Sequence, residues 1–225
     1  MQIENENRGI MTISKNWQIM PSEIFATGPI VPVLVINKVE EALPIAEALL
    51  AADVKVLEVT LRTPAALDVI SLIAKELPEA IIGSGTVTNR HQLQQSIDAG
   101  AKFAISPGLT KDLLQAGNES SIALIPGIAS ISELMDAADL GYNHLKFFPA
   151  EASGGVNAIK AIGAPFPNIT FCPTGGISLK NVRNYLALSN VACCGGSWLV
   201  PNDAVENKDW AMITKLAKET LTYVK

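Results

Sequence analysis

The stretch Lys55–Arg62 reads KVLEVTLR and has the pattern of a buried β-strand with one charged face. Side chains alternate between the two faces of a strand, so every second residue shares a face. One face is wholly apolar and consists of Leu57, Val59 and Leu61. The other face carries Glu58 and Arg62. We therefore predict that the apolar face packs on helices and that both charged side chains point into an enclosed interior, with Arg62 nearer the mouth.

Seven other short apolar runs have the same strand-like composition and start roughly 20 to 25 residues apart, which is room for a strand, a loop and a helix. These runs are Val31–Ile36, Ala80–Thr86, Phe103–Ser106, Ala123–Ile125, Leu145–Phe148, Ile169–Pro173 and Val191–Cys194. The repeat therefore predicts strands that alternate with helices rather than a meander of hairpins.

Segments of helical period lie between several of these runs. They are Glu40–Ala51, Pro64–Leu77, Asn89–Ala99, Ser130–Leu140, Ser178–Leu188 and Lys208–Tyr223. An additional helix is predicted at Ser14–Phe25, before the first strand. Its apolar residues are expected to plug the bottom of the fold, and they are Trp17, Ile19, Met20, Ile24 and Phe25.

Eight apolar strands, each followed by a helical segment, favour an all-parallel sheet that is buried on both faces. We predict an α/β fold, a (β/α)8 TIM barrel with an extra N-terminal helix, because a closed barrel leaves no exposed edge strand. A doubly wound open sheet is the alternative, but the GxGxxG motif that usually follows its first strand is absent. Residues 1–13 are expected to form a flexible tail and residues 14–225 a single barrel domain.

The composition argues against several classes of partner. The formal net charge is −5 and only 5% of the residues are aromatic. Nucleic acids and anionic membrane surfaces need a basic patch, and single-stranded RNA also needs aromatic side chains for stacking. No run of about 18 apolar residues could span a bilayer, and the first nine residues lack the pattern of a signal peptide. We therefore expect neither nucleic acid nor membrane as a partner.

The three cysteines, Cys172, Cys193 and Cys194, do not form the pattern of a disulfide framework or a zinc site. Buried thiols on strands are the expected role, which favours a reducing, cytoplasmic location. His91 and His144 are predicted to lie far from the mouth, so a His-rich metal site is not expected.

Lys146 is unusual because it lies within the apolar run around Leu145–Phe148, and lysine is rarely buried without a partner. A lysine whose amine extends to water is the simplest interpretation of this residue alone. Glu58 on the inner face of another strand changes that judgement, since the two groups would form an acid–base pair in one cavity. A nucleophilic lysine beside a carboxylate predicts Schiff-base chemistry on a carbonyl substrate, with Glu58 moving protons.

Glycine pairs end the last two predicted strands, at Gly175–Gly176 and Gly195–Gly196. In (β/α)8 barrels the loops after strands seven and eight often bind phosphate through exposed backbone amides. Together the two pairs predict a phosphorylated ligand. Glu151 could hold a divalent cation together with Glu58, although a solvated surface carboxylate is the simpler interpretation.

Several motifs together resemble one enzyme family, the 2-keto-3-deoxy-6-phosphogluconate and 4-hydroxy-2-oxoglutarate aldolases. They are VLEVTLRT (56–63), GTV (85–87), FAISPGL (103–109), LIPGI (124–128), KFFPAE (146–151), FCPTGGIS (171–178) and GGSWLVP (195–201). The resemblance implies a bacterial class I aldolase of carbohydrate metabolism, in the Entner–Doudoroff pathway, that forms a homotrimer and uses neither metal nor cofactor. Its substrate would be a phosphorylated 2-keto-3-deoxy sugar acid.

The resemblance also assigns a role to each matching residue. Lys146 would form the Schiff base and Glu58 would be the general acid and base. The residues around the pyruvyl group and its carboxylate would be Arg62, Thr86, Pro107 and Phe148. Thr174 would contact substrate hydroxyls. The phosphate would bind at Gly175, Gly176, Gly196 and Ser197. Ser84, where the family pattern suggests alanine, is a minor departure.

Two alternatives remain at this stage. One is a related 2-keto-3-deoxy-6-phosphogalactonate aldolase, which would differ in the hydroxyl configuration it prefers, decided near Thr174 and Ser197. The other is a non-catalytic barrel that binds a sugar phosphate. Such a protein would keep the glycine loops but would have no need for Lys146 opposite Glu58, and this observation disfavours it.

Overall fold

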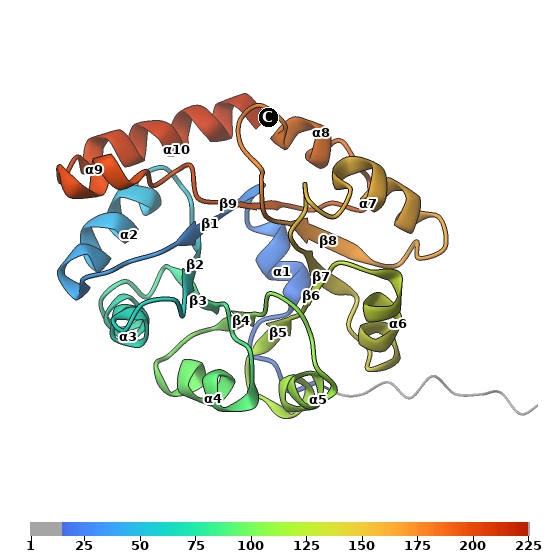
Figure 1. Ribbon diagram of the computed structural model, residues 1–225. Coiled ribbons are helices and arrows are strands. Elements are labelled where there is room, and N and C mark those ends of the chain that lie inside the picture. Colours follow the sequence, from blue (N-terminus) through green and yellow to red (C-terminus); the bar gives the residue numbers. More distant parts are fainter. Residues whose placement is uncertain (1–14, 225) are drawn as a thin grey trace, which may run out of the picture.

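The computed structural model describes residues 15–224, in which parallel strands curl around a central axis and most helices lie outside them (Figure 1). The predicted flexible tail, 1–13, lies outside the described residues. The strands are β1 (Ile30–Leu34), β2 (Val56–Thr60), β3 (Ile81–Gly85), β4 (Phe103–Ile105), β5 (Ala123–Ile125), β6 (Gly127–Ile128), β7 (His144–Phe147), β8 (Thr170–Pro173) and β9 (Cys194–Gly196). Every strand except β6 overlaps a predicted run, so the predicted α/β class with parallel strands is confirmed.

Hydrogen bonding divides the strands into two groups. One sheet has the order β5-β4-β3-β2-β1-β9 and the other has the order β6-β7-β8. Only Pro126 separates β5 from β6, and its carbonyl accepts a hydrogen bond from the Lys146 amide at 3.0 Å. At the other end, parallel bridges join Phe171 to Val191 and Thr174 to Gly195. The curled arrangement is therefore barrel-like.

Most of the helices surround this curled sheet, whereas α1 lies within the ring of strands in the view of Figure 1. The helices are α1 (Pro21–Ala26), the short 3-10 helix η1 (Val39–Glu41), α2 (Ala42–Leu50), α3 (Ala66–Glu76), α4 (Arg90–Asp98), α5 (Lys111–Glu119), α6 (Ile131–Asp139), α7 (Gly155–Gly163), α8 (Val182–Leu186), α9 (Asn202–Glu206) and α10 (Trp210–Val224). A capping box begins α6, because the Ser130 hydroxyl and the Glu133 carboxylate each accept a hydrogen bond from the other's backbone amide. No helix within residues 15–224 is long and apolar enough to cross a membrane.

The predicted N-terminal helix is shorter than expected. It starts at Pro21, so the prediction of a helix from Ser14 is wrong over residues 15–20, while Ser14 itself lies outside the described residues. The cause is local: proline suits the first helical turn, and the residue before a proline favours an extended backbone. Met20 is extended, and its amide donates to the Glu23 carboxylate at 2.8 Å.

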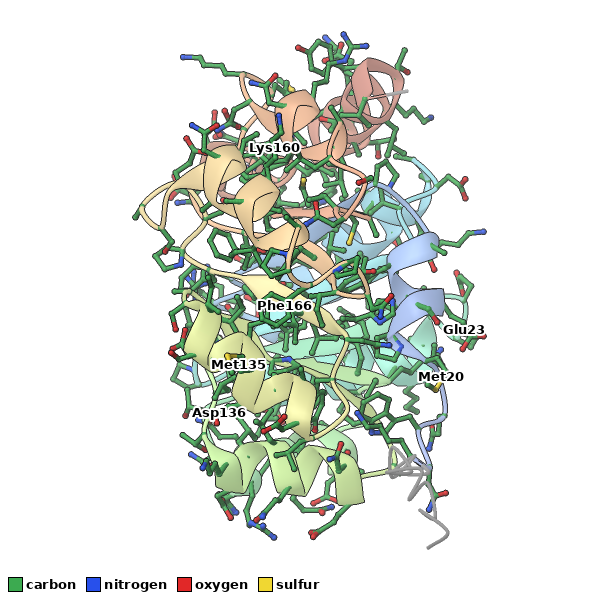
Figure 2. All side chains as sticks on the ribbon, turned by 90° about the vertical axis from the view of Figure 1, so that its right-hand side faces the viewer. Met20, Glu23, Met135, Asp136, Lys160 and Phe166 are labelled. Atoms are coloured by element: carbon green, nitrogen blue, oxygen red, sulfur yellow. The ribbon has the colours of Figure 1, made fainter. Side chains whose placement is uncertain are left out.

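Helix α1 lies across one end of the curled sheet (Figure 1). Ile24 and Phe25 are buried there, and the Phe25 ring meets His144, the first residue of β7, edge-on at 5.3 Å between centroids. Trp17 and Ile19 pack partly buried against the same cluster. Met20 is 43% exposed and lies at the outer edge of the molecule (Figure 2), so its predicted place in the plug is wrong.

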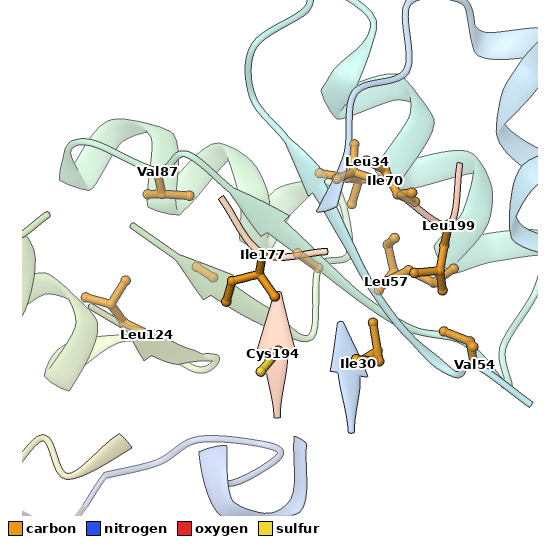
Figure 3. Close-up of a cluster of buried hydrophobic side chains, with 14 of the residues drawn as sticks. Ile30, Leu34, Val54, Leu57, Ile70, Val87, Leu124, Ile177, Cys194 and Leu199 are labelled. Carbon is orange, nitrogen blue, oxygen red and sulfur yellow. The ribbon is translucent and has the colours of Figure 1, made fainter. Parts of the chain in front are cut away.

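Apolar side chains form two layers, one inside the curl of the sheet and one between the sheet and the outer helices. The inner cluster contains Val31, Val56, Phe103, Ile105, Ala123, Ile125, Cys172 and Cys193 together with Ile24 and Phe25. The outer cluster includes Leu34, Leu57, Ile70 and Leu124 (Figure 3). The alternating face of β2 behaves as predicted, because Leu57 and Val59 belong to the outer cluster.

Phe103 provides a test of the inner cluster. Its side chain is fully buried, and a Cβ on Gly83 would overlap its ring. We expect Phe103→Ala to lower the free energy of unfolding by about 3–5 kcal/mol, because a large cavity would remain inside the sheet. Urea unfolding measures this change. The exposed control Met212→Ala should shift stability by no more than about 0.5 kcal/mol. A loss below about 1 kcal/mol for Phe103→Ala would contradict the described packing.

Candidate active site

Lys146 and Glu58 form a buried ion pair inside the curled sheet. The Lys146 Nζ lies 3.3 Å from Glu58 Oε1, and the two residues are 5% and 1% exposed. Lys146 is in β7 and Glu58 is in β2, so the pair joins the two hydrogen-bonded sheets across the interior. Removing either partner would leave the other as an uncompensated buried charge, which is strongly destabilising. Each side chain can therefore be charged at this buried position only because the other is present.

The neighbouring strand makes room for the carboxylate. In the parallel register Glu58 lies beside Val33 of β1 and Gly83 of β3. A Cβ on Gly85, also in β3, would overlap Glu58 Oε1. Glycine at this position therefore allows a charged side chain to fit where an ordinary residue would fill the space.

A cavity of about 910 Å³ opens at the carboxyl ends of the strands. Ten of the residues singled out from the sequence line it, and they are Arg62, Thr86, Pro107, Lys146, Phe148, Thr174, Gly175, Gly176, Gly196 and Ser197. Glu58 does not line the cavity itself, but its carboxylate accepts a hydrogen bond from Lys146, which does. The structure thus brings together every predicted site residue, although they come from strands and loops far apart in the chain.

Arg62 and Thr86 lie together at one side of this cavity. The Arg62 Nε donates to Thr86 Oγ1 at 3.4 Å, and Arg62 is exposed. Thr86 has a φ of 62°, the left-handed region that side chains other than glycine rarely adopt. The loop after β3 therefore holds this hydroxyl in an unusual position beside the guanidinium.

Phe148 and Thr174 form parts of the wall near Lys146. The Lys146 Nζ lies 5.2 Å from the centre of the Phe148 ring, within the range of a cation–π contact. Thr174 is 7% exposed, and within residues 15–224 its Oγ1 has no hydrogen-bond partner. Buried hydroxyl groups are usually hydrogen-bonded, so this unpaired hydroxyl in the cavity wall is an exception, and it lies against Gly195, where an added Cβ would overlap it.

The two glycine pairs meet at another part of the cavity. Gly175 and Gly176 have φ values of 102° and 75°, which strongly favour glycine. On β9, a Cβ on Gly195 would overlap Thr174 Oγ1, and a Cβ on Gly196 would overlap the Trp198 ring. All four positions therefore require glycine for conformation or for close approach.

The cavity also has a wall that the sequence interpretation missed. It includes Lys38 and Glu41 from the segment after β1 and Asn202 and Glu206 from α9. The Lys38 Nζ lies 4.0 Å from Glu41 Oε1. The position of Lys38 shortly after a predicted strand could have indicated that it lies near the site, because the carboxyl ends of parallel strands meet at the same edge of a sheet. No comparable signal in the sequence indicated that α9 lines the cavity.

The cysteines are buried free thiols, as expected from the sequence. Cys172 and Cys193 belong to the inner cluster and Cys194 to the outer one. A hydrogen bond with Cys172 and burial both raise the pKa of the Cys193 thiol, so it stays protonated. Burial lowers the pKa of His144, which lies at the start of β7, at the opposite end from the cavity.

Glu151 and Glu58, considered as a possible cation pair, have other partners. Glu58 is paired with Lys146, and Glu151 accepts a hydrogen bond from the Tyr185 hydroxyl. In the described part of the chain, no three His, Cys, Asp or Glu side chains gather as metal ligands would.

With this geometry in place, the sequence profile described as "KDPG and KHG aldolase" matches residues 22–216, most of the chain. The chain belongs to this aldolase family. It is therefore an enzyme of the carbon–carbon lyase class.

Similar proteins agree with the family. The 2-dehydro-3-deoxy-phosphogluconate aldolase of Pseudoalteromonas atlantica is 64% identical over 93% of this chain and 97% of its own length. The KHG/KDPG aldolase of Escherichia coli K12 is 58% identical over 92% of this chain and 97% of its own. A crystal structure of KDPG aldolase from Legionella pneumophila, with pyruvate captured as a covalent carbinolamine intermediate, superposes with a TM-score of 0.90. It shares 52% identity and covers 91% of this chain and 100% of that one.

Gly85 offers a test of how closely this aldolase site is packed. We expect Gly85→Ala to displace the Glu58 carboxylate and to lower kcat by roughly 10²-fold, the loss typical of a 1 Å misplacement in an active site. Steady-state kinetics measures it. Gly28→Ala is the matched control, because nothing lies within 4 Å of a Cβ there. A Gly85→Ala variant with the kcat of the native protein would contradict the described contact.

Proposed function

We propose that this enzyme cleaves 2-keto-3-deoxy-6-phosphogluconate to pyruvate and glyceraldehyde 3-phosphate through a Schiff base on Lys146. We propose the same chemistry for 4-hydroxy-2-oxoglutarate, which would give pyruvate and glyoxylate. The observation that carries the proposal is the buried pair of Lys146 and Glu58 at a large cavity. Relatives at 64% and 58% identity whose names specify these substrates support it.

The pyruvyl part of the substrate would lie between Lys146 and Arg62. Arg62 presents a planar guanidinium that suits a carboxylate through two parallel hydrogen bonds, and Thr86 lies beside it. Pro107 and Phe148 would bound the apolar side of the same region, since both line the cavity. This arrangement would align the keto carbon with the lysine amine.

The other end of the substrate would lie at the glycine loops. Thr174 lines the cavity beside these loops, which supports its contact with a substrate hydroxyl. The backbone at Gly175, Gly176 and Gly196, together with Ser197, would bind the phosphate group. Local donors of this kind explain how a chain with a net charge of −5 could bind an anionic substrate.

The first chemical step is imine formation. The Lys146 amine attacks the C2 keto carbon to form a carbinolamine, which loses water and becomes a protonated imine. Glu58, at 3.3 Å from the amine, is placed to accept and return the protons of this step.

Cleavage follows from the electron-withdrawing imine. The C4 hydroxyl loses its proton, the C3–C4 bond breaks, and its electron pair moves through C3 to the imine nitrogen, giving an enamine and an aldehyde. Because Glu58 does not line the cavity, we propose that a water molecule carries this proton to its carboxylate. The proton then returns to C3, and water hydrolyses the imine to release pyruvate and the free lysine. The imine is the electron sink, so these steps draw on no cofactor or metal.

Three further features belong to the proposal. We propose that the strands close into a complete (β/α)8 barrel formed by one domain over 14–225, supported by the bridges that join Phe171 to Val191 and Thr174 to Gly195. A homotrimer is proposed from the resemblance of the sequence motifs to the family. A cytoplasmic location is supported by three buried free thiols.

Trapping with borohydride tests the proposed nucleophile. Incubation with pyruvate and sodium borohydride should reduce the imine and leave one stable adduct, which peptide mass spectrometry should place on Lys146. Lys146→Arg keeps a cation beside Glu58 but cannot form the imine, so it should remain unlabelled. Lys38→Arg, a change at the other cavity lysine, should label like the native protein. An adduct that persists in Lys146→Arg would overturn the proposal.

A further inference from the structure

The turn at Gly175–Gly176 is held from outside by polar contacts. Both residues are glycines, so the turn has no side chains that could hold it in place. Their φ values of 102° and 75° are ones that glycine adopts readily, but glycine can adopt many other backbone conformations as well. The Glu151 amide donates to the Gly175 carbonyl at 3.1 Å, and the Asn181 side-chain amide donates to the Gly176 carbonyl at 3.0 Å. The conformation of this turn therefore depends on the hydrogen bonds that it accepts from Glu151 and Asn181.

Glu151 also supports the turn with its side chain. A Cβ on Gly176 would lie 2.6 Å from Glu151 Cγ and 2.8 Å from its Cβ, so the stem of the glutamate lies directly against Gly176. Glu151 follows β7 and is exposed overall. An exposed glutamate normally samples several rotamers, so something must hold this stem in place.

Tyr185 supplies that restraint. It lies in α8, its side chain is fully buried, and its hydroxyl donates to Glu151 Oε1. Gly155, the first residue of α7, packs against the same hydrogen bond, since a Cβ there would lie 3.2 Å from both the Tyr185 hydroxyl and Glu151 Oε1. Burial, and then the bond to Glu151, raise the pKa of Tyr185, so the hydroxyl keeps the proton that it donates.

We propose that Tyr185 is a positioning residue for phosphate recognition: by holding the Glu151 side chain against Gly176, it fixes the Gly175–Gly176 turn for the substrate phosphate. This inference rests on the proposed function, which places the phosphate at these glycines. Tyr185 does not line the cavity, so it would act only through Glu151 and the turn. Its effect should therefore appear with phosphorylated substrates and not with unphosphorylated ones.

The test compares two substrates in Tyr185→Phe, which removes only the hydroxyl. With 2-keto-3-deoxy-6-phosphogluconate, KM should rise roughly three- to tenfold with kcat within about twofold, the range expected for one lost hydrogen bond. Both constants for 4-hydroxy-2-oxoglutarate should stay within about twofold. Inorganic phosphate, used as a competitive inhibitor, should show a similar rise in its inhibition constant.

Two further variants separate positioning from general destabilisation. Tyr142→Phe is the matched control, because that buried hydroxyl donates to the Leu114 carbonyl and does not line the cavity, so it should leave both substrates unaffected. Glu151→Gln keeps an acceptor for Tyr185 and should retain the native preference for the phosphorylated substrate. Glu151→Ala removes both the acceptor and the stem and should reproduce or exceed the effect of Tyr185→Phe, which also covers the case in which Tyr185→Phe folds poorly.

The outcomes distinguish this inference from the proposed function. If the native protein prefers the phosphorylated substrate but Tyr185→Phe and Glu151→Ala keep that preference, the positioning role is overturned and the function stands. Equal losses on both substrates would likewise overturn it in favour of a purely structural role. If the native protein cleaves neither substrate, the proposed function fails and this inference fails with it. If it cleaves both without preferring the phosphorylated one, the cleavage function stands, but the phosphate site at these glycines and this inference are overturned.

Discussion

The ion pair between Lys146 and Glu58 is the constraint on which the rest of the site depends. Two opposite charges lie 3.3 Å apart on side chains that are 5% and 1% exposed. Such a pair is tolerated only when both partners are present and well placed. Their strands, β2 and β7, must therefore face each other, which requires the sheet to curl, and Gly85 must leave the carboxylate its space. The curl of the sheet that defines the fold is thus also what brings Lys146 and Glu58 together in the site.

The cavity above this pair combines rigid strand ends with loops of unusual backbone conformation. Glycines at 175 and 176 and the threonine at 86 all have positive φ, and all line the cavity. Conformations of this kind persist only where the surrounding structure enforces them, and they often occur at functional sites. The contacts of Glu151, Asn181 and Tyr185 provide this enforcement at the glycine turn.

Much of this arrangement was predictable from the sequence, because it follows from local periodicity. The alternation in KVLEVTLR placed Glu58 opposite the apolar face of β2, and the spacing of the apolar runs located the other strands. Local signals failed where tertiary contacts or proline chemistry decide the outcome. The first helix begins only at Pro21 and is shorter than predicted. Helix α9, which follows β9, was not predicted, because the spacing of the apolar runs indicates strands and gives no sign of this additional short helix. The contact of Tyr185 with Glu151 joins residues from two different segments, so neither residue could be recognised alone.

Exchange of the methyl protons of pyruvate in deuterated water tests the central claim most directly, because it requires both members of the buried pair. The imine on Lys146 must form, and Glu58 must then move a proton at the methyl carbon. The account predicts rapid exchange by the native protein, none by Lys146→Arg, and exchange slowed about 10²- to 10⁴-fold in Glu58→Gln, the usual contribution of a general acid–base. An unchanged exchange rate in Glu58→Gln, with the imine still formed, would contradict it.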